Sequence, residues 1–264
     1  MNKAMKHTIY IFACVLALSC SKGAVSEKPI VLRMPSGTGS NDAIYVTAVK
    51  EDGSFLFQAQ SFGKGDGENY SGDHYWPVSG KLSFYADNCG GSRRSGSHGG
   101  SCMEILMEPG VDTVTGKAEN ISNGSSVSLS LGHPFARLYA LSLSSADGST
   151  ISVNSVRVVG RTGGWYCLRH MVWTETSSPE TVSFPATLYS CGDLLFVPGN
   201  ASIILNYTAT VGSSSQTYEK TAGITLEAGK KTTVYATVGA DALPITADIQ
   251  AETWIEPDTV NILL

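Results

Sequence analysis

The residue types that most often do chemistry in proteins occur in this chain, but their spacing forms no catalytic motif. The histidines lie in unrelated contexts, without the H-E-x-x-H pair of a zinc enzyme. The sequence has no G-x-S-x-G nucleophile elbow and no P-loop. Asp66, Glu68 and Asp73 depart from the spacing of an EF-hand, so a solvated loop is the better interpretation. These patterns predict a protein that is not an enzyme and needs no cofactor or metal.

The first nineteen residues have the pattern of a secretory signal sequence. Lys3 and Lys6 precede an apolar stretch at residues 9–18, which is too short to span a bilayer. Residues 16–20, LALSC, resemble a bacterial lipobox, so we expect cleavage before Cys20 and acylation of its thiol; ordinary signal cleavage is the alternative. Acyl chains anchor a protein stably when two or more are present. The N-terminus therefore predicts an exported lipoprotein of the outer membrane.

Four further cysteines remain once Cys14 and Cys20 are set aside. They are Cys89, Cys102, Cys167 and Cys191. No two of them form a C-x-x-C pair, and an exported chain permits disulfides. Sequence alone does not choose among the three possible pairings. We favour Cys89 with Cys102 and Cys167 with Cys191, because each closes a loop inside one expected domain; four free thiols are the alternative.

A Gly- and Ser-rich segment lies between Cys89 and Cys102 and contains Arg93, Arg94 and His98. Its low complexity gives it no apolar side chains to pack, so an exposed loop tied at its base is expected. The two arginines and the histidine are candidates to bind an anion or an acidic glycan. A solvated loop without a ligand is the simpler alternative.

Alternation with a period of two residues recurs along the chain and predicts short strands with one buried face. The clearest examples lie at 126–131, 203–211 and 245–255, with turn signals such as Glu51-Asp52-Gly53 between strands. No segment has the spacing of an amphipathic helix, which disfavours helical bundles and parallel α/β folds. We therefore expect an all-β fold of two tandem antiparallel β-sandwich domains.

The expected domain boundary lies at residues 117–126, where Gly, Asn and Ser accumulate. It divides the chain into a signal peptide (1–19), an N-terminal tether with a possible removable strand (20–33), an N-terminal sandwich (34–120) and a C-terminal sandwich (121–264). Only 16% of the residues are charged and the net charge is −5. Nucleic-acid binding depends on clustered Lys and Arg, so this composition argues against it.

Three stretches of the sequence resemble the fimbrillin family, the lipoprotein pilins and adhesins of type V pili in Bacteroidales-type bacteria. They are YWPVSGKLSFYA at 75–86, VSLSLGHPFARL at 127–138, and GITLEAGKKTTVY at 223–235 followed by 245–254. In the first, Pro77 ends a strand, Gly80 turns, and Leu82, Phe84 and Ala86 face inward. The Cys-bounded Gly/Ser/Arg segment departs from the family pattern.

This resemblance implies transthyretin-like or immunoglobulin-like sandwiches, a location on the outer membrane and in the fimbrium, and assembly with other pilus subunits by strand exchange. In such pilins a trypsin-like protease cuts after a basic residue and frees an N-terminal strand. Arg33 follows the apolar residues 30–32 and is our candidate cut site; an ordinary surface arginine is the alternative. Val260, Ile262 and Leu264 are candidates for the donor strand; an edge strand of their own domain is the alternative.

Two functions from different classes follow. The first is a structural or tip subunit of a surface pilus, for which sequence does not choose between stalk, tip and anchor. The alternative is a monomeric outer-membrane lipoprotein that binds host glycan or protein through its tryptophans and the Arg–His loop, although tryptophans in a sandwich are more often core residues. An enzyme would need carboxylates or histidines that converge only in the fold.

Overall fold

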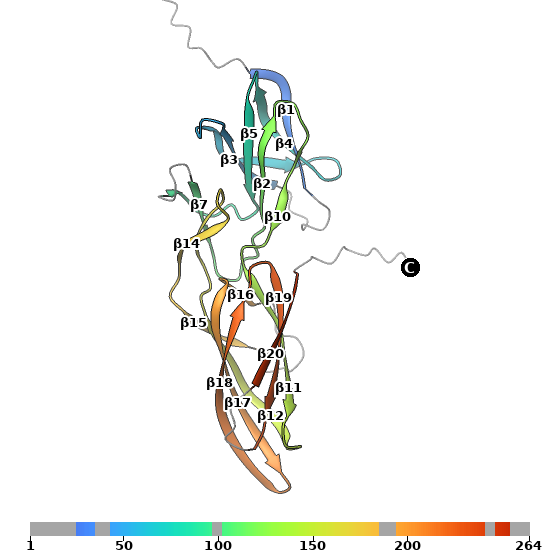
Figure 1. Cartoon of the computed structure of the whole chain (residues 1–264), viewed down its shortest axis with the longest axis vertical. Helices are drawn as coiled ribbons and strands as arrows, with labels where there is room; N and C mark the ends of the chain where they lie inside the picture. Colours follow the sequence, from blue (N-terminus) through green and yellow to red (C-terminus); the bar gives the residue numbers. More distant parts are fainter. Residues whose placement is uncertain (1–24, 35–42, 97–101, 185–193, 241–245, 254–264) are drawn as a thin grey trace, which may run out of the picture.

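The computed structural model describes residues 25–34, 43–96, 102–184, 194–240 and 246–253. Over these ranges the chain forms twenty β-strands and no helix, which confirms the all-β prediction for the part described. Consistent with this, none of the described ranges contains a helix long and apolar enough to cross a membrane. The strands form four sheets along an elongated body (Figure 1).

The first sheet contains eight strands in the order β10-β8-β5-β2-β3-β4-β1-β9. Their bounds are β1 (Val25–Arg33), β2 (Ala43–Lys50), β3 (Phe55–Lys64), β4 (Asn69–Pro77), β5 (Lys81–Asp87), β8 (Thr115–Ser122), β9 (Val127–Ser128) and β10 (Ser130–Gly132). The two edge strands, β9 and β10, are separated only by Leu129, which is buried. The sheet therefore closes on itself around its own core, the first core, in which Trp76 packs edge-on against Phe84.

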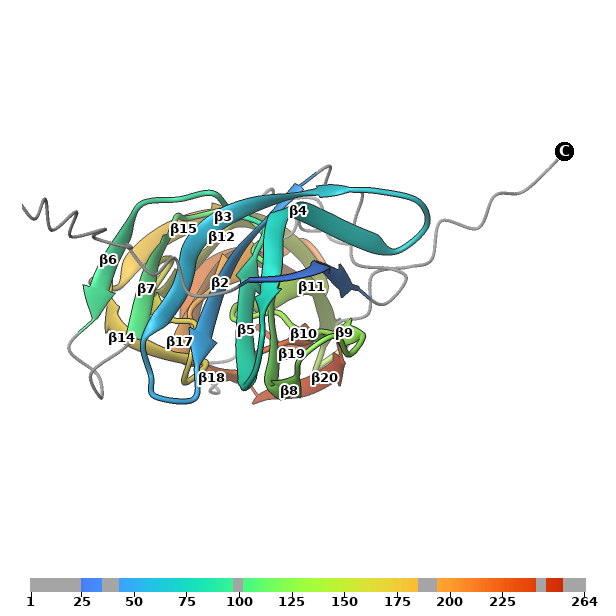
Figure 2. The ribbon, with the colours of Figure 1, turned by 90° about the horizontal axis from the view of Figure 1, so that it is seen from above.

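The second sheet has the order β14-β13-β7-β6 and lies beside the first (Figure 2). Its strands are β6 (Arg93–Gly96), β7 (Cys102–Met107), β13 (Gly164–Cys167) and β14 (Val172–Thr176). Ile105 of β7 and Tyr166 of β13 share a core cluster with Val49 and Tyr85 of the first sheet. Strand β5 is therefore buried on both faces, because Leu82 and Phe84 face one core and Tyr85 the other.

The third and fourth sheets enclose another core. The third has the order β16-β11-β19-β20, with β11 (Ala136–Ser145), β16 (Leu194–Phe196), β19 (Lys230–Val238) and β20 (Thr246–Thr253). The fourth has the order β15-β12-β17-β18, with β12 (Thr150–Gly160), β15 (Glu180–Phe184), β17 (Gly199–Val211) and β18 (Ser214–Leu226). Leu138 of the third sheet and Leu205 of the fourth lie in one buried cluster. The pairing of β11 with β19 is parallel.

The sheets do not follow a single cut in the sequence. Strand β8 continues past residue 120, and β9 and β10 belong to the first sheet. Strands β13 and β14 return from the later part of the chain to pair in the second sheet. The Gly and Asn residues near 123 form the turn after β8, where Gly124 has a φ of 71°. A boundary after residue 120 would pass through β8. The division into an N-terminal sandwich (34–120) and a C-terminal sandwich (121–264) stays a prediction.

Candidate functional site

Strand β1 is inserted between β4 and β9 in the first sheet. It runs antiparallel to β4 and parallel to β9, and the β9 pairing joins Leu32 to Val127 and Arg33 to Ser128. Ile30 and Leu32 are fully buried. Because side chains alternate along a strand, these two residues face the first core while Val31 faces outward. The inner face of β1 is therefore an integral part of that core.

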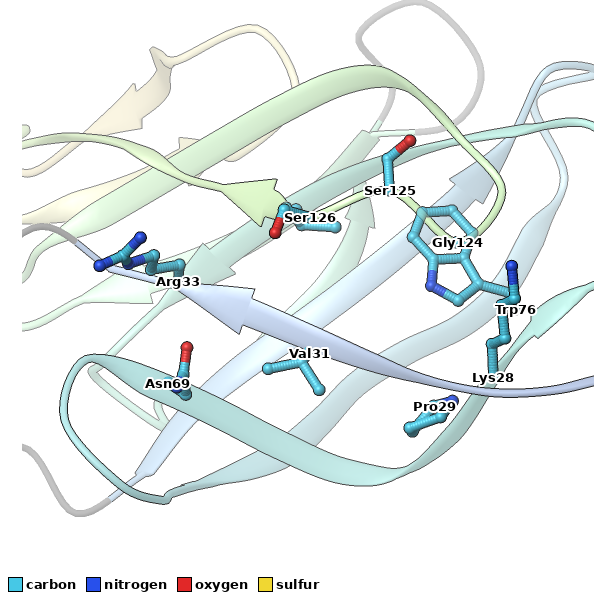
Figure 3. Close-up of a pocket in the computed structure, with 10 residues that line it drawn as sticks. Lys28, Pro29, Val31, Arg33, Asn69, Trp76, Gly124, Ser125 and Ser126 are labelled. Atoms are coloured by element: carbon cyan, nitrogen blue, oxygen red, sulfur yellow. The ribbon is translucent and has the colours of Figure 1, made fainter.

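A groove separates the earlier part of β1 from the loop that leads into β9. It has a volume of about 470 Å³, and its walls include Lys28, Pro29 and Val31 on one side and residues 124–127 on the other. Figure 3 shows Gly124, Ser125 and Ser126 across the groove from β1. Over the described residues β9 pairs only with the last two residues of β1. The rest of β1 is held laterally by β4.

Arg33 is the last residue of β1, and its side chain is 66% exposed. Its guanidinium lies 3.4 Å from the carboxylate of Glu68. The peptide bond that follows is held on both sides, because the Leu129 N–H donates to the Arg33 carbonyl at 3.0 Å and the Met34 N–H donates to the Glu68 carbonyl at 3.1 Å. The side chain is thus available to a protease, whereas cleavage of the bond requires these hydrogen bonds to open.

Arg93 and Arg94 are committed to contacts within the chain. Arg93 donates two hydrogen bonds to Asp87, at 2.8 and 3.0 Å, and the Asp87 side chain is 1% exposed. Arg94 donates to Glu104 at 2.7 Å and to Glu175 at 2.8 Å. Its guanidinium carbon also lies 4.1 Å from the ring centroid of Trp165.

The expectation of a loop is wrong for residues 93–96, which form β6 and pair with β7, although Arg94 and Ser95 are exposed as expected. The buried carboxylates of Asp87 and Glu104 need a charged partner, and pairing with them orders the two arginines. The Gly- and Ser-rich composition of the segment does not reveal these partners. His98, the third candidate of the segment, lies outside the described residues. Arg93 therefore links β6 to β5 of the first sheet, and Arg94 links β6 to β7 and β14 within the second sheet. The binding of an anion by these residues stays a prediction.

The favoured disulfide pairing is wrong, because Cys102 is bonded to Cys167, with 6.0 Å between their Cα atoms. The bond joins β7 to β13, which are neighbours in the second sheet although 65 residues separate the two cysteines. The expected pairing assumed that each bond closes a loop between cysteines near in sequence, and that assumption gave no indication of a bond between β7 and β13. Cys89 is a free cysteine; burial, followed by the nearby charge of Asp87, raises the pKa of its thiol to about 11. Cys191 lies outside the described residues.

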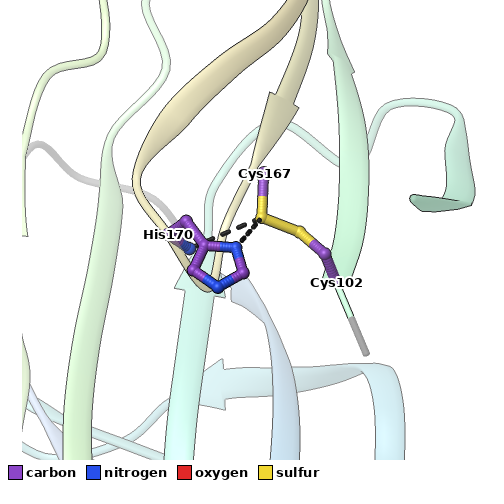
Figure 4. A group of neighbouring side chains, drawn as sticks. All are labelled: Cys102, Cys167 and His170. Atoms are coloured by element: carbon purple, nitrogen blue, oxygen red, sulfur yellow. Dashed lines mark hydrogen bonds between the residues drawn. A yellow bond between two sulfur atoms is a disulfide. The ribbon is translucent and has the colours of Figure 1, made fainter. Parts of the chain in front are cut away.

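His170 lies next to this disulfide (Figure 4). Its Nδ1 atom is 3.3 Å from the Cys167 sulfur, and its backbone N–H donates to the same sulfur at 3.4 Å. Sequence reasoning missed the group, although the spacing Cys167-Leu168-Arg169-His170 was a usable signal. A C-x-x-H turn is one half of many zinc sites, and the other half comes here from a strand distant in sequence.

The described tryptophans do not form a common stacking surface. Trp76 is buried in the first core, and Trp173 packs edge-on against Phe135 and Tyr166. Trp165 lies under the guanidinium of Arg94. Trp254 lies outside the described residues, as do Cys20 and the donor-strand candidates Val260, Ile262 and Leu264.

Comparison with known proteins places these features in context. A model of the fimbrillin-like family matches residues 33–256. No curated protein sequence matches the chain. The fold is similar to that of a fimbrial protein from Bacteroides vulgatus, with a TM-score of 0.61 and 14% identity over 86% of this chain and 99% of the other.

Candidate cell adhesion proteins of solved structure are also similar. One from Parabacteroides distasonis has a TM-score of 0.57 and 8% identity, over 88% of this chain and 100% of the other. Another, from Bacteroides uniformis, has a TM-score of 0.56 and 13% identity, over 86% and 98%. At these identities the likeness establishes a shared fold.

Proposed function

Because this chain belongs to the fimbrillin-like family, a family of fimbrial and adhesion proteins and not of enzymes, we propose that it is a subunit of a cell-surface fimbrium. It is exported as a lipoprotein anchored to the outer membrane through Cys20, and it joins other pilus subunits by strand exchange. The core inside the first sheet and the core between the third and fourth sheets support a pair of β-sandwiches of the transthyretin-like or immunoglobulin-like kind.

The position of β1 carries this proposal. β1 is a single strand that lies between β4 and β9 and ends at the exposed Arg33. Cleavage after Arg33 followed by loss of β1 would leave a slot bounded by two strands and floored by the first core. Backbone groups of β4 and β9 would then be free to pair with a strand from another subunit, which is β-augmentation.

The slot would have specific requirements for its new occupant. Loss of β1 removes Ile30 and Leu32 from the core, and each fully buried side chain of this size contributes about 1.5–3 kcal/mol. An incoming strand must restore about 3–6 kcal/mol by placing apolar side chains two residues apart. Val260, Ile262 and Leu264 have this spacing, which makes them our candidates for the donor strand.

The test compares two arginines of similar surroundings. Arg33 bonds to Glu68 and Arg157 bonds to Glu219, and both are partly exposed. We expect an arginine-specific, trypsin-like protease to give a product that begins at Met34 and forms a ladder of polymers on a denaturing gel. R33Q should block both results and R157Q neither. A ladder of equal strength from R33Q would refute the assignment of Arg33.

A second variant tests the donor separately from the cut. Deletion of residues 260–264 should leave cleavage after Arg33 unchanged and abolish the ladder. If the truncated chain still polymerises, the donor is another segment. If the full chain is cut and releases β1 but never polymerises with itself, its role as a self-polymerising stalk subunit is refuted.

A further inference from the structure

Three potential metal ligands meet at one end of β7 and β13, the two central strands of the second sheet. They are the sulfur atoms of Cys102 and Cys167 and a ring nitrogen of His170, and all three ligand atoms lie within 4.8 Å of one another. Cys102 begins β7, Cys167 ends β13, and His170 lies in the turn between β13 and β14. Neither the fimbrial role nor the disulfide alone accounts for the histidine.

The geometry around Cys167 is close to that of a zinc site. Ligand distances of about 2.3 Å for sulfur and 2.0–2.1 Å for nitrogen, arranged tetrahedrally, place the two atoms roughly 3.5 Å apart. The observed distance from Sγ of Cys167 to Nδ1 of His170 is 3.3 Å. The His170 N–H bond to the same sulfur would stabilise a thiolate, which is the form that binds metal.

The backbone already brings the second sulfur into range. Cys102 and Cys167 lie on paired strands, where Cys167 is opposite Glu104, and their Cα atoms are 6.0 Å apart. Reduction would let the sulfur atoms separate by side-chain rotation to roughly the 3.8 Å that two tetrahedral zinc thiolates require. Both cysteines are buried whereas His170 is exposed, so a cation has an entry path from the histidine side.

We propose that Cys102, Cys167 and His170 form a binding site for a zinc-like divalent cation when the disulfide is reduced. Two equivalents of a small thiol, each losing one electron and one proton, become a disulfide and convert the cystine to two thiols. The cation then displaces two protons, and two thiolates neutralise its charge. Three protein ligands leave one position for water. The cation would thus replace the disulfide as the link between β7 and β13.

The experiment uses the exported chain, reduced under nitrogen with a phosphine and exposed to Co²⁺ or Zn²⁺ alone. We expect one cation per chain, a thiolate-to-cobalt charge-transfer absorption and the visible bands of tetrahedral cobalt. H170A is the decisive variant because it keeps both cysteines and forms the same disulfide when oxidised. It should lose the cation at a metal concentration that saturates the unsubstituted chain. C102S and C167S should lose it as well.

Matched controls separate this site from adventitious binding. H133A removes a histidine that bonds to Asp112, and C89S removes a free thiol. C191S removes another cysteine of the exported chain. All three should retain the cation. If the reduced chain unfolds, recovery of its near-UV circular dichroism on adding Zn²⁺ would support the site. Failure to bind any cation, retention by H170A, or loss in C89S would overturn it, and none of these results bears on the fimbrial role.

Discussion

Replacement of Leu32 by alanine measures how far β1 belongs to the first core. Leu32 is 0% exposed, and its neighbours in the buried cluster include Trp76 and Val127. The substitution removes three carbon atoms. At about 0.8 kcal/mol for each, the loss of burial alone costs about 2.4 kcal/mol. The cavity left behind raises the total, and Leu→Ala changes in protein cores typically cost about 2–5 kcal/mol. We therefore expect the free energy of unfolding of the first core to fall by about 3–4 kcal/mol.

The assay must report on the first core separately, because the chain contains more than one. Hydrogen exchange followed by mass spectrometry in increasing urea does so through peptides from β4 and β5, with peptides from β17 as an internal reference. V31A is the matched control, since Val31 lies on the outward face of the same strand and is 39% exposed. It should cost less than about 1 kcal/mol. No change is expected in β17 for either variant.

Cleavage adds a second arm to this prediction. Once the chain is cut after Arg33 and β1 has been lost, wild-type and L32A products are identical and must have the same stability. A cost below about 1 kcal/mol for L32A in the uncut chain would show that β1 rests on the core without contributing to it, which would refute the reasoning. An equal loss of protection in β17 would also refute it, because the effect would then not be confined to the first core.

Three further predictions concern charged and reactive groups. R93A leaves the Asp87 carboxylate buried without its partner and should lower the free energy of unfolding in urea by about 3–5 kcal/mol; a neutral effect would contradict a structural role. Because the pKa of Cys89 is raised from about 9 to about 11, iodoacetamide at pH 8 should label it about 100-fold more slowly than in the unfolded chain. The stability that the neutral thiol contributes should be lost as pH rises from about 9 to 11. Hydrogen bonds, first from the Ser149 hydroxyl, hold the pKa of Asp147 well below its usual range, so its contribution to stability is present above about pH 4 and is lost on acidification. D147N should therefore make Tm fall less steeply as the pH is lowered below about 4, and an unchanged fall would contradict this assignment.

The sequence predicted the features of the fold that depend on local alternation. Ile203, Leu205, Tyr207 and Ala209 were expected to share one face of a strand, and all four are buried in β17. Val211, at the end of the same series, is 55% exposed because the strand extends beyond the core at that end. A period of two residues determines which face is buried, and this information is contained within a few neighbouring residues.

The sequence did not predict the features that depend on which strands are neighbours. The disulfide, the Arg94–Glu175 ion pair and the Cys–His cluster all arise because β13 and β14 join β6 and β7. Each strand could satisfy its own alternation beside several different partners, so the spacing of the cysteines contained no information on their pairing. The same ambiguity affected the turn at Gly124, since Gly, Asn and Ser favour both linkers and tight turns.

The neighbours of β1 also determine the direction in which a replacement strand would run. β1 is antiparallel to β4 over the register from Val25 to Arg33, but parallel to β9 at only two positions. A strand entering in the direction of β1 would recover the long antiparallel pairing, whereas a reversed strand would pair antiparallel only with short β9. Antiparallel pairing is slightly more stable per residue, and β4 offers the longer edge. We therefore expect the donor to run in the direction of β1, so that a crosslink between an engineered cysteine near its N-terminal end and one at position 77 of β4 forms, while a crosslink to position 69 does not.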